Sequence, residues 1–380
     1  MAVQSNVYLL ILVAGTVFTG CLNSLFTKYQ DNQCVKNCDN PDLSTHKLFE
    51  QPALQTLQMF IGEMGCFIVY YLIFRTKLFQ KEQEYTAIGG TPKITFKESF
   101  KLAVPAICDL LGTTLLNIGL MYTPVSVYQM MRGSIVLFVA FLSVIFLKRK
   151  ITKLEWIELI IISLGIAIVG LAGSKGQSGP IEKESLVVLG IVLIVIAEFS
   201  QAFQFVVEEH IFSKQPIIPL QLVYYEGFYG SVILMVALVI LNFVIGSTSS
   251  PEEFYNSPFN LSESFKEMFS SQAVLLSSVA IMVSIASFNY FGISLTFHLS
   301  ATARSTIDSC RTLLVWLFAL LLGWESFSFL QLSGFILLVF GTLCFNQALK
   351  PEEWSWIPAS LKSPPHPALI DELDEPLERS

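Results

Sequence analysis

Residues 125–147 read VSVYQMMRGSIVLFVAFLSVIFL, an apolar run of 23 residues that contains a single charge, Arg132. A helix rises about 1.5 Å per residue, so about 20 mostly apolar residues cross roughly 30 Å of hydrocarbon. The run is therefore long enough to span a membrane. The arginine inside it needs a specific reason, because an ionised side chain at the bilayer centre costs about 2.5–3.5 kcal/mol.

The rest of the chain repeats this pattern. Of its 380 residues 53% are hydrophobic and only 14% are charged, with a mean hydropathy of +0.60, whereas a soluble domain carries about 25% charged residues. The sequence therefore predicts an all-α membrane protein with ten transmembrane helices. The expected spans are residues 5–27, 53–74, 100–121, 125–147, 155–173, 185–211, 221–245, 272–297, 302–323 and 327–349.

The two ends of the chain have distinct characters. Residues 5–27 resemble a signal peptide in their apolar content, but no Lys or Arg precedes them and no A-x-A site follows, so we expect a retained first helix. Residues 351–380 form an acidic tail, which we expect to be cytosolic and disordered. The formal charge of -7 gives no reason to expect a nucleic-acid partner.

Lys and Arg residues gather in alternate loops. Most of the 23 lie after the second, fourth, sixth and eighth spans and in the tail, and the positive-inside rule assigns such loops to the cytosol. Both termini are then cytosolic. Arg132 and Arg311 are the two assigned to the interior of spans. The opposite loops hold Lys28, Lys36, Lys47, Lys175, Lys183 and Lys266.

Two features of the opposite loops agree with a lumenal location. Asn260 begins the glycosylation sequon Asn260-Leu261-Ser262, and Cys34 and Cys38 are spaced to pair in an oxidising compartment. These features favour an endomembrane or surface protein. The cysteines that fall in apolar runs are expected to be small core residues: Cys21, Cys66, Cys108 and Cys310.

The two halves of the chain carry matching segments. Residues 126–133 read SVYQMMRG and residues 305–312 read STIDSCRT, which place Arg132 and Arg311 at the same position of the fourth and ninth spans. GEMG around Glu63 and YEGFYG around Glu226 match in the second and seventh spans. Five spans per half is an odd number, so the halves enter the membrane from opposite sides. We expect one transmembrane domain over residues 1–350, with inverted repeats over residues 5–173 and 185–349.

The charges inside the spans are the candidate functional residues. Arg132 and Arg311 would bind a phosphate or carboxylate through paired hydrogen bonds. The alternative is a purely structural role, because Asp308 lies three residues before Arg311 on the same helix face. Glu63 and Glu226 are candidates for substrate binding or proton exchange, or else for hydrogen bonds between helices.

Further candidates lie close to these charges. Gln129 and Tyr128 precede Arg132 on the fourth span and are candidate substrate contacts. Near the ends of the first and sixth spans, where long side chains snorkel to the interface, lie the candidate gating residues Lys28, Glu208 and Glu209. Tyr128, Tyr224 and Tyr225 are candidates for stacking on a ring, or are interfacial aromatics. No role is assigned to Asp109 and Glu198.

Several segments resemble a known family. QMMRG at residues 129–133, EFSQAFQFVVEEHIF at 198–212 and FNYFGISLTFHLSATARSTIDSCRTLLVWLFALLLGWESF at 288–327 look like the drug/metabolite transporter superfamily. Within it the chain is most similar to the nucleotide-sugar-transporter-like solute carrier 35 family, in particular its F-type branch. The resemblance covers about residues 5–349. It implies a ten-helix transporter without cofactors.

We therefore expect a secondary transporter that moves a small organic solute by alternating access. Its solute is a nucleotide sugar, a nucleotide or an organic cation; five acids against two arginines inside the spans suit a cation or zwitterion better than a nucleotide sugar. The alternatives are a transport-inactive scaffold or receptor and, less favoured, an integral-membrane enzyme. No enzyme motif occurs at usable spacing, and the dispersed histidines make a poor metal set: His46, His210, His298 and His366.

Location and partners rest on weaker patterns. Tyr85-Thr86-Ala87-Ile88 fits an adaptor-binding Y-x-x-Φ signal in a cytosolic loop. Together with the F-type resemblance, whose branch includes a lysosomal member, it favours the lysosomal membrane, with the Golgi membrane as the alternative. The lipid bilayer is the expected environment, and a homodimer is a further expectation.

Overall fold

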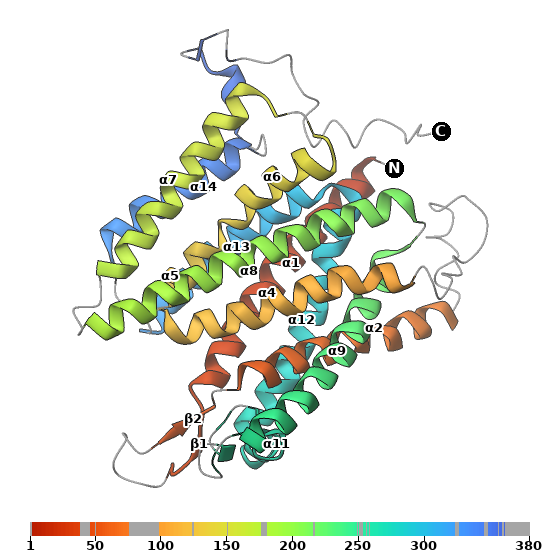
Figure 1. Ribbon diagram of the computed structural model, residues 1–380. Helices are drawn as coiled ribbons and strands as arrows, with labels where there is room; N and C mark the ends of the chain where they lie inside the picture. Colours follow the sequence, from red (N-terminus) through yellow and green to blue (C-terminus); the bar gives the residue numbers. More distant parts are fainter. Residues whose placement is uncertain are drawn as a thin grey trace. The chain divides into compact units, whose positions relative to one another are not determined.

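A computed structural model describes most of the chain (Figure 1). It is mostly helical, and its helices are α1 (Ala2–Asp31), α2 (Pro52–Arg75), α4 (Ala103–Tyr122), α5 (Val125–Arg132), α6 (Ile135–Phe146), α7 (Lys153–Lys175), α8 (Ile181–Lys214), α9 (Pro219–Thr248), α11 (Leu261–Ser270), α12 (Gln272–His298), α13 (Ala301–Leu321) and α14 (Phe329–Phe345), with 3-10 turns η3 (Phe100–Leu102) and η4 (Pro351–Glu353). The described residues are 2–38, 46–49, 51–75, 99–123, 125–149, 151–175, 181–215, 217–248, 250, 254–255, 257, 259–323, 327–345, 349–355, 357–358 and 361.

The chain forms two compact units, which are described separately. Their boundaries fall within α1, α4, α8 and α12. Most of the acidic tail and the adaptor signal at 85–88 lie outside the described residues. Unit 1 consists of Met1–Phe18, Leu115–His210 and Ser294–Ser380, and unit 2 of Thr19–Thr114 and Ile211–Ile293.

Within the described residues, six helical stretches are long and apolar enough to cross a membrane. This confirms a multi-pass membrane protein, while the count of ten spans stays a prediction. Two shorter apolar helices, Ile135–Phe146 and Phe329–Phe345, accompany them. The six stretches are Val7–Asp31, Pro52–Ile73, Phe100–Tyr122, Leu186–Lys214, Pro219–Thr248 and Gln272–His298.

Large apolar side chains are exposed along the helices. Phe329, Leu321 and Phe243 are 81%, 80% and 73% exposed. A water-soluble monomer rarely presents so many neighbouring apolar groups, whereas hydrocarbon is a suitable solvent for them. The exposed surface of the helices is therefore the surface that lipid covers.

In unit 1, α7 and α14 run side by side (Figure 1). A Cβ atom at Gly165 would lie 2.8 Å from the carbonyl oxygen of Gly334, and one at Gly341 would lie 2.8 Å from the Ile162 side chain. As one helix advances from 162 to 165 its partner runs from 341 to 334, so the two helices are antiparallel. Because glycine has no side chain, the two backbones pack closely at these positions.

In unit 2, α2 and α9 form a second antiparallel pair (Figure 1). A Cβ atom at Gly227 would lie 2.7 Å from Cβ of Glu63, and the side chain of Gln221 donates a hydrogen bond to the Tyr70 hydroxyl at 3.0 Å. Gly227, directly after Glu226, therefore lies where the α2 backbone comes close. Gly65, two residues after Glu63, faces open space, and the close approach on α2 is at Gly62, against the Met282 backbone.

The span predicted at 125–147 is not one continuous helix. The helix α5 ends at Arg132 and α6 begins at Ile135, with a turn at Gly133 and Ser134 between them. The amide of Ser134 donates to the Met131 carbonyl at 3.0 Å, three residues back, which tightens the chain there. A glycine followed by a serine is a common cause of such an interruption.

Local sequence explains the next helix start. Thr152 and Glu155 form a capping box at the beginning of α7: the Thr152 amide donates to Glu155 Oε2 at 2.6 Å, and the Glu155 amide donates to Thr152 Oγ1 at 3.2 Å. This reciprocal pair satisfies two amides that a helix start leaves open. The T-x-x-E spacing thus fixes the first turn of the helix.

Unit 2 contains a polar cap made of the strands β1 (Cys34–Lys36) and β2 (Lys47–Leu48), Gln51 and the helix α11. The strands are antiparallel, and a disulfide joins Cys34 to Cys38, which confirms the predicted pairing. At the centre Glu267 lies 2.9 Å from Lys47, 3.1 Å from Lys36 and 2.9 Å from the Gln51 amide. Burial disfavours the Glu267 carboxylate, but these donors outweigh it and hold its pKa below the usual range.

We expect Gly227→Ala to destabilise the protein by about 1–3 kcal/mol, because a methyl group there collides with the backbone of α2. Gly65→Ala is the matched control: it faces open space and replaces glycine by a better helix former, so its stability should be unchanged or slightly higher. Thermal unfolding in detergent measures both. Equal melting temperatures for the two variants would contradict the close packing at residue 227.

We expect Glu267→Gln to lower the melting temperature near neutral pH. Because the folded-state pKa of Glu267 is lowered, its stabilisation is present above the ordinary glutamate pKa of about 4.3 and is lost as the pH falls through the folded-state value. The difference in melting temperature between the variant and the parent protein should therefore become smaller below about pH 4. Glu353→Gln, at an exposed ion pair, should show little difference at any pH.

Candidate functional site

Arg132 is the last residue of α5, immediately before the break at Gly133. A cation is favoured at a helix C-terminus, where carbonyl groups carry partial negative charge. Non-helical backbone at membrane depth is tolerated where it is buried in protein or faces a wet cavity, and transporters commonly place binding sites at such interrupted helices. The break therefore marks Arg132 as a candidate binding residue.

Two carboxylates face the Arg132 guanidinium without forming short hydrogen bonds to it. Its Nε lies 3.7 Å from Glu198 Oε1 and its Nη2 lies 3.9 Å from Asp308 Oδ2. Both distances exceed the usual hydrogen-bond range, and neither Arg132 Nε nor Glu198 Oε1 has a hydrogen-bond partner in the described part of the chain. The ring of Tyr128 lies 5.8 Å from the guanidinium carbon, at the limit of a cation–π contact. Arg132 thus retains donor capacity.

Arg311 is held differently. Its Nε donates to Asp308 Oδ1 at 2.7 Å, and both side chains are buried. This is the structural alternative that the spacing of the two residues already suggested. Asp308 therefore lies between two guanidiniums, tied to Arg311 and only loosely paired with Arg132.

A further arginine inside the protein, Arg304, was missed from the sequence. Arg304 is 2% exposed, forms an ion pair with the fully buried Glu208, and lies over the Phe205 ring with its guanidinium carbon 3.8 Å from the centroid. The count of Lys and Arg residues in alternate loops assigned Arg304 to a loop. Its spacing of four residues from Asp308 and seven from Arg311 nevertheless places all three on one helix face. That spacing was the signal that could have identified it.

The predicted gating residues have other partners. Glu208 does not snorkel to an interface, because Arg304 holds it in the interior. Glu209 accepts a hydrogen bond from the Ala301 amide at 2.7 Å and so caps the start of α13, together with the hydroxyl of Ser300. Lys28 lies in the last turn of α1, in unit 2, whereas both glutamates belong to unit 1. A gating role for the three stays a prediction.

Glu63 and Glu226 are both buried in unit 2, at the crossing of α2 and α9. Glu63 accepts a hydrogen bond from the side-chain amide of Asn289 on α12. This matches the expected alternative of hydrogen bonding between helices. Asp109, to which no role was assigned, accepts a hydrogen bond from Thr113 at 3.0 Å within its own helix.

Aromatic residues cluster near these acids. The rings of Tyr224 and Tyr225 lie 4.6 Å apart, and Tyr70 lies 5.5 Å from Tyr224. The tyrosines therefore contact one another, and stacking on a solute stays a prediction. Gln129 lies in α5, but its side chain is outside the described positions.

The glycosylation candidate Asn260 forms a contact within the polar cap. Asn260 is buried as the N-cap of α11, where its side chain accepts a hydrogen bond from the Glu263 amide, so its glycosylation stays a prediction.

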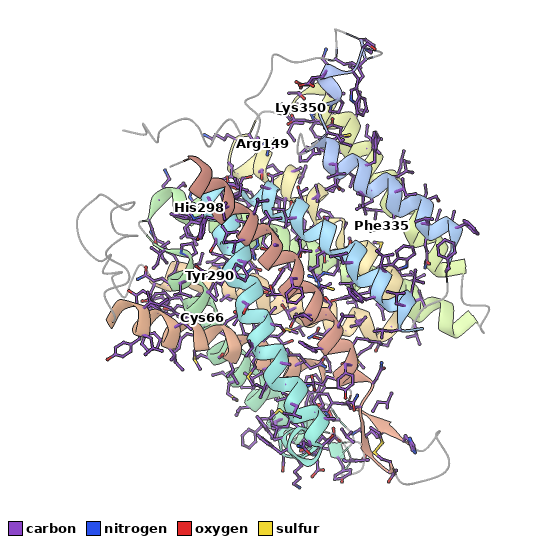
Figure 2. All side chains as sticks on the ribbon, turned by 180° about the vertical axis from the view of Figure 1, so that it is seen from behind. Cys66, Arg149, Tyr290, His298, Phe335 and Lys350 are labelled. Atoms are coloured by element: carbon purple, nitrogen blue, oxygen red, sulfur yellow. A yellow bond between two sulfur atoms is a disulfide. The ribbon has the colours of Figure 1, made fainter. Side chains whose placement is uncertain are left out.

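Arg149, labelled in Figure 2, donates a hydrogen bond to Thr302 at 3.0 Å and lies 3.5 Å from Glu155. Phe335, also labelled there, packs with Trp316 at 6.2 Å between ring centroids.

Comparison with known proteins identifies the family. A model described as nucleotide-sugar transporter matches residues 47–243, more than half of the chain. The chain belongs to the nucleotide-sugar transporter family. Its members are transporters rather than enzymes, so this family member is a solute transporter of a membrane.

Similar proteins extend over nearly the whole chain. Solute carrier family 35 member F6 of Mus musculus is 35% identical over 348 residues, 90% of each chain, which confirms the F-type resemblance. An uncharacterized protein of Schizosaccharomyces pombe is 35% identical over 332 residues, 87% of this chain and 95% of its own length. UDP-galactose translocator of Mus musculus is 28% identical over 110 residues, 29% of this chain and 28% of its own.

A solved structure supports the fold alone. A crystal structure of another protein superposes with a TM-score of 0.54 over 90% of this chain and 98% of that chain. The two sequences are 12% identical, so the match carries no information on substrate.

We expect Arg304→Met to destabilise this transporter by about 3–5 kcal/mol, because it leaves the Glu208 carboxylate buried without its charge partner. The double variant Arg304→Met with Glu208→Met removes both charges and should recover most of that loss. Thermal unfolding and gel-filtration profiles in detergent distinguish the two. A double variant no better than the single one would contradict a self-contained ion pair.

Proposed function

We propose that the protein is a secondary transporter of an anionic organic solute, and that Arg132 binds the anionic group. The observation that carries the proposal is the loosely paired guanidinium at the helix break, with its nearest carboxylates at 3.7 and 3.9 Å. Among the described residues, Nε has no hydrogen-bond partner in both Arg132 and Arg304, so the distances are what distinguish Arg132. The guanidinium geometry matches a phosphate or carboxylate through two parallel hydrogen bonds. Arg304 joins α13 to α8 through Glu208, whereas Arg311 is paired with Asp308 of its own helix, so neither guanidinium is as loosely held as that of Arg132.

The charge balance no longer favours a cation. With Arg304 included, the group of contacting charges on α5, α8 and α13 contains the three arginines Arg132, Arg304 and Arg311 and the three acids Glu198, Glu208 and Asp308. The excess acids of the sequence analysis belong to unit 2. This group has no excess of acids that would favour a cation, and its loosely held arginine is the part that suits an anionic group. UDP-galactose, named for one relative, and simple nucleotides are therefore the first probes.

Alternating access between two inverted repeats is the proposed mechanism. A two-fold axis in the membrane plane brings each helix near it against its own counterpart, in the reverse direction. The antiparallel pairs α2 with α9 and α7 with α14 support this arrangement, because they match the second with the seventh and the fifth with the tenth predicted span. Packing of α13 against α5 and α6 supports it further, since these contain the ninth and fourth spans.

The proposed location is a Golgi or lysosomal membrane with both termini in the cytosol. The disulfide between Cys34 and Cys38 supports it, because disulfides persist in oxidising compartments and the charge distribution puts that loop in the lumen. The transporter family supports an endomembrane location. Epitope tags at each terminus and in the 34–38 loop, probed in selectively permeabilised cells, test the orientation.

We expect Arg132→Ala to reduce uptake of an anionic probe by about tenfold or more, the loss for charge-assisted hydrogen bonds of about 1.5–3 kcal/mol. Arg132→Lys should recover part of the activity, because it restores the charge but not the planar fork. The measurement is uptake into proteoliposomes of UDP-galactose, UMP and tetraethylammonium.

Arg149→Ala is the matched control, since it removes an arginine of the same unit that contacts Thr302 and Glu155. Its uptake should stay within about twofold of the parent. Uptake of the anions undiminished in Arg132→Ala would overturn the binding role. No uptake of any probe by the parent protein would instead favour a transport-inactive scaffold.

A further inference from the structure

Glu198 is a buried acid that has no part in the proposed binding of an anion by Arg132. Its side chain is 1% exposed on α8, and it is the carboxylate closest to Arg132 Nε, at 3.7 Å. Neither of the two facing atoms has a hydrogen-bond partner among the described residues. An ion pair whose facing atoms form no hydrogen bond is poorly compensated for lost hydration, so this contact is weaker than those of Arg304 with Glu208 and Arg311 with Asp308.

The charged and titratable groups around Glu198 come from two other helices. Arg132 and Tyr128 face it from α5, and Asp308 and Arg311 face it from α13. The two arginines balance the two carboxylates, so this group of four charges is neutral. An anion that bound Arg132 would make it net negative in surroundings of low polarity, which is unfavourable.

One of the two carboxylates can lose its charge more easily than the other. Asp308 accepts a 2.7 Å hydrogen bond from Arg311, and protonation would weaken that bond. Glu198 has no comparable bond at Oε1, and a protonated Glu198 would gain a donor where none exists now. Protonation of Glu198 therefore restores neutrality with the smallest loss of contacts.

We propose that Glu198 takes up one proton when an anionic group of the solute binds Arg132, so that proton and anion cross the membrane together. The proton comes from water on the side of entry, binds a carboxylate oxygen of Glu198, and returns to water when the anion leaves on the other side. The Arg132 guanidinium then pairs with the solute anion in place of the Glu198 carboxylate, and it stays charged throughout. This inference rests on the proposed anion transport.

The test is uptake of UMP and UDP-galactose into proteoliposomes at external pH values from about 5.5 to 8, with a pH-sensitive dye inside. In the parent protein uptake should increase as the external pH falls, by at most about tenfold per pH unit, which is the slope for one proton. One proton should enter for each solute molecule transported, because Glu198 binds a single proton in each cycle. Glu198→Gln, an imitation of the protonated acid, should transport with less than about twofold change across this range.

Glu158→Gln is the matched control, because Glu158 is a buried glutamate on α7 of the same unit, outside this cluster; it should keep the parental pH profile. Glu198→Asp keeps a titratable group and should keep a pH dependence. Parental uptake without a proton flux, or an unchanged pH profile in Glu198→Gln, would overturn the inference and leave anion transport intact. Absence of any anion uptake by the parent would overturn both. If Glu198→Gln does not fold, the proton flux of the parent decides.

Discussion

A guanidinium or carboxylate that leaves water loses several kcal/mol of hydration, and only close opposite charges and hydrogen bonds restore it. In unit 1, the helices α5, α8 and α13 bring together three arginines and the three acids Glu198, Glu208 and Asp308, and the pairs that join different helices constrain which helices can be neighbours. Arg304 and Arg311 meet this demand with short contacts to Glu208 and Asp308. Arg132 meets it only in part. This unequal compensation separates two arginines with a close charge partner from one with capacity for a ligand.

The break after Arg132 adds to that distinction. A continuous helix would satisfy its backbone internally, whereas the turn at Gly133 and Ser134 interrupts the helix directly after the residue that carries the guanidinium. The equivalent helix α13 is continuous from Ala301 to Leu321 and carries the tightly paired Arg311. The two arginines that look alike in sequence therefore differ in structure, and the asymmetry coincides with the interrupted helix.

Much of this could be predicted from sequence, because lipid imposes long apolar helices and makes buried charges conspicuous. The membrane class, the disulfide and the pairing of Asp308 with Arg311 followed from length and spacing. Arg304 could not be recognised by hydropathy alone, since it lies two residues inside a predicted span and resembles a loop residue. The partners of Arg132 and Arg304 on α8 were also hidden, because contacts across more than 60 residues depend on packing that no local pattern encodes.

The two adjacent acids Glu208 and Glu209 have a mechanical consequence. Glu208 forms an ion pair with the Arg304 side chain, and Glu209 accepts a hydrogen bond from the amide of Ala301 at the start of α13. A slide of α13 along α8 by one turn, about 5.4 Å, would break both attachments at once. These two contacts fix the axial position of α13 along α8, so a rearrangement of unit 1 that keeps them intact moves this stretch of the two helices together.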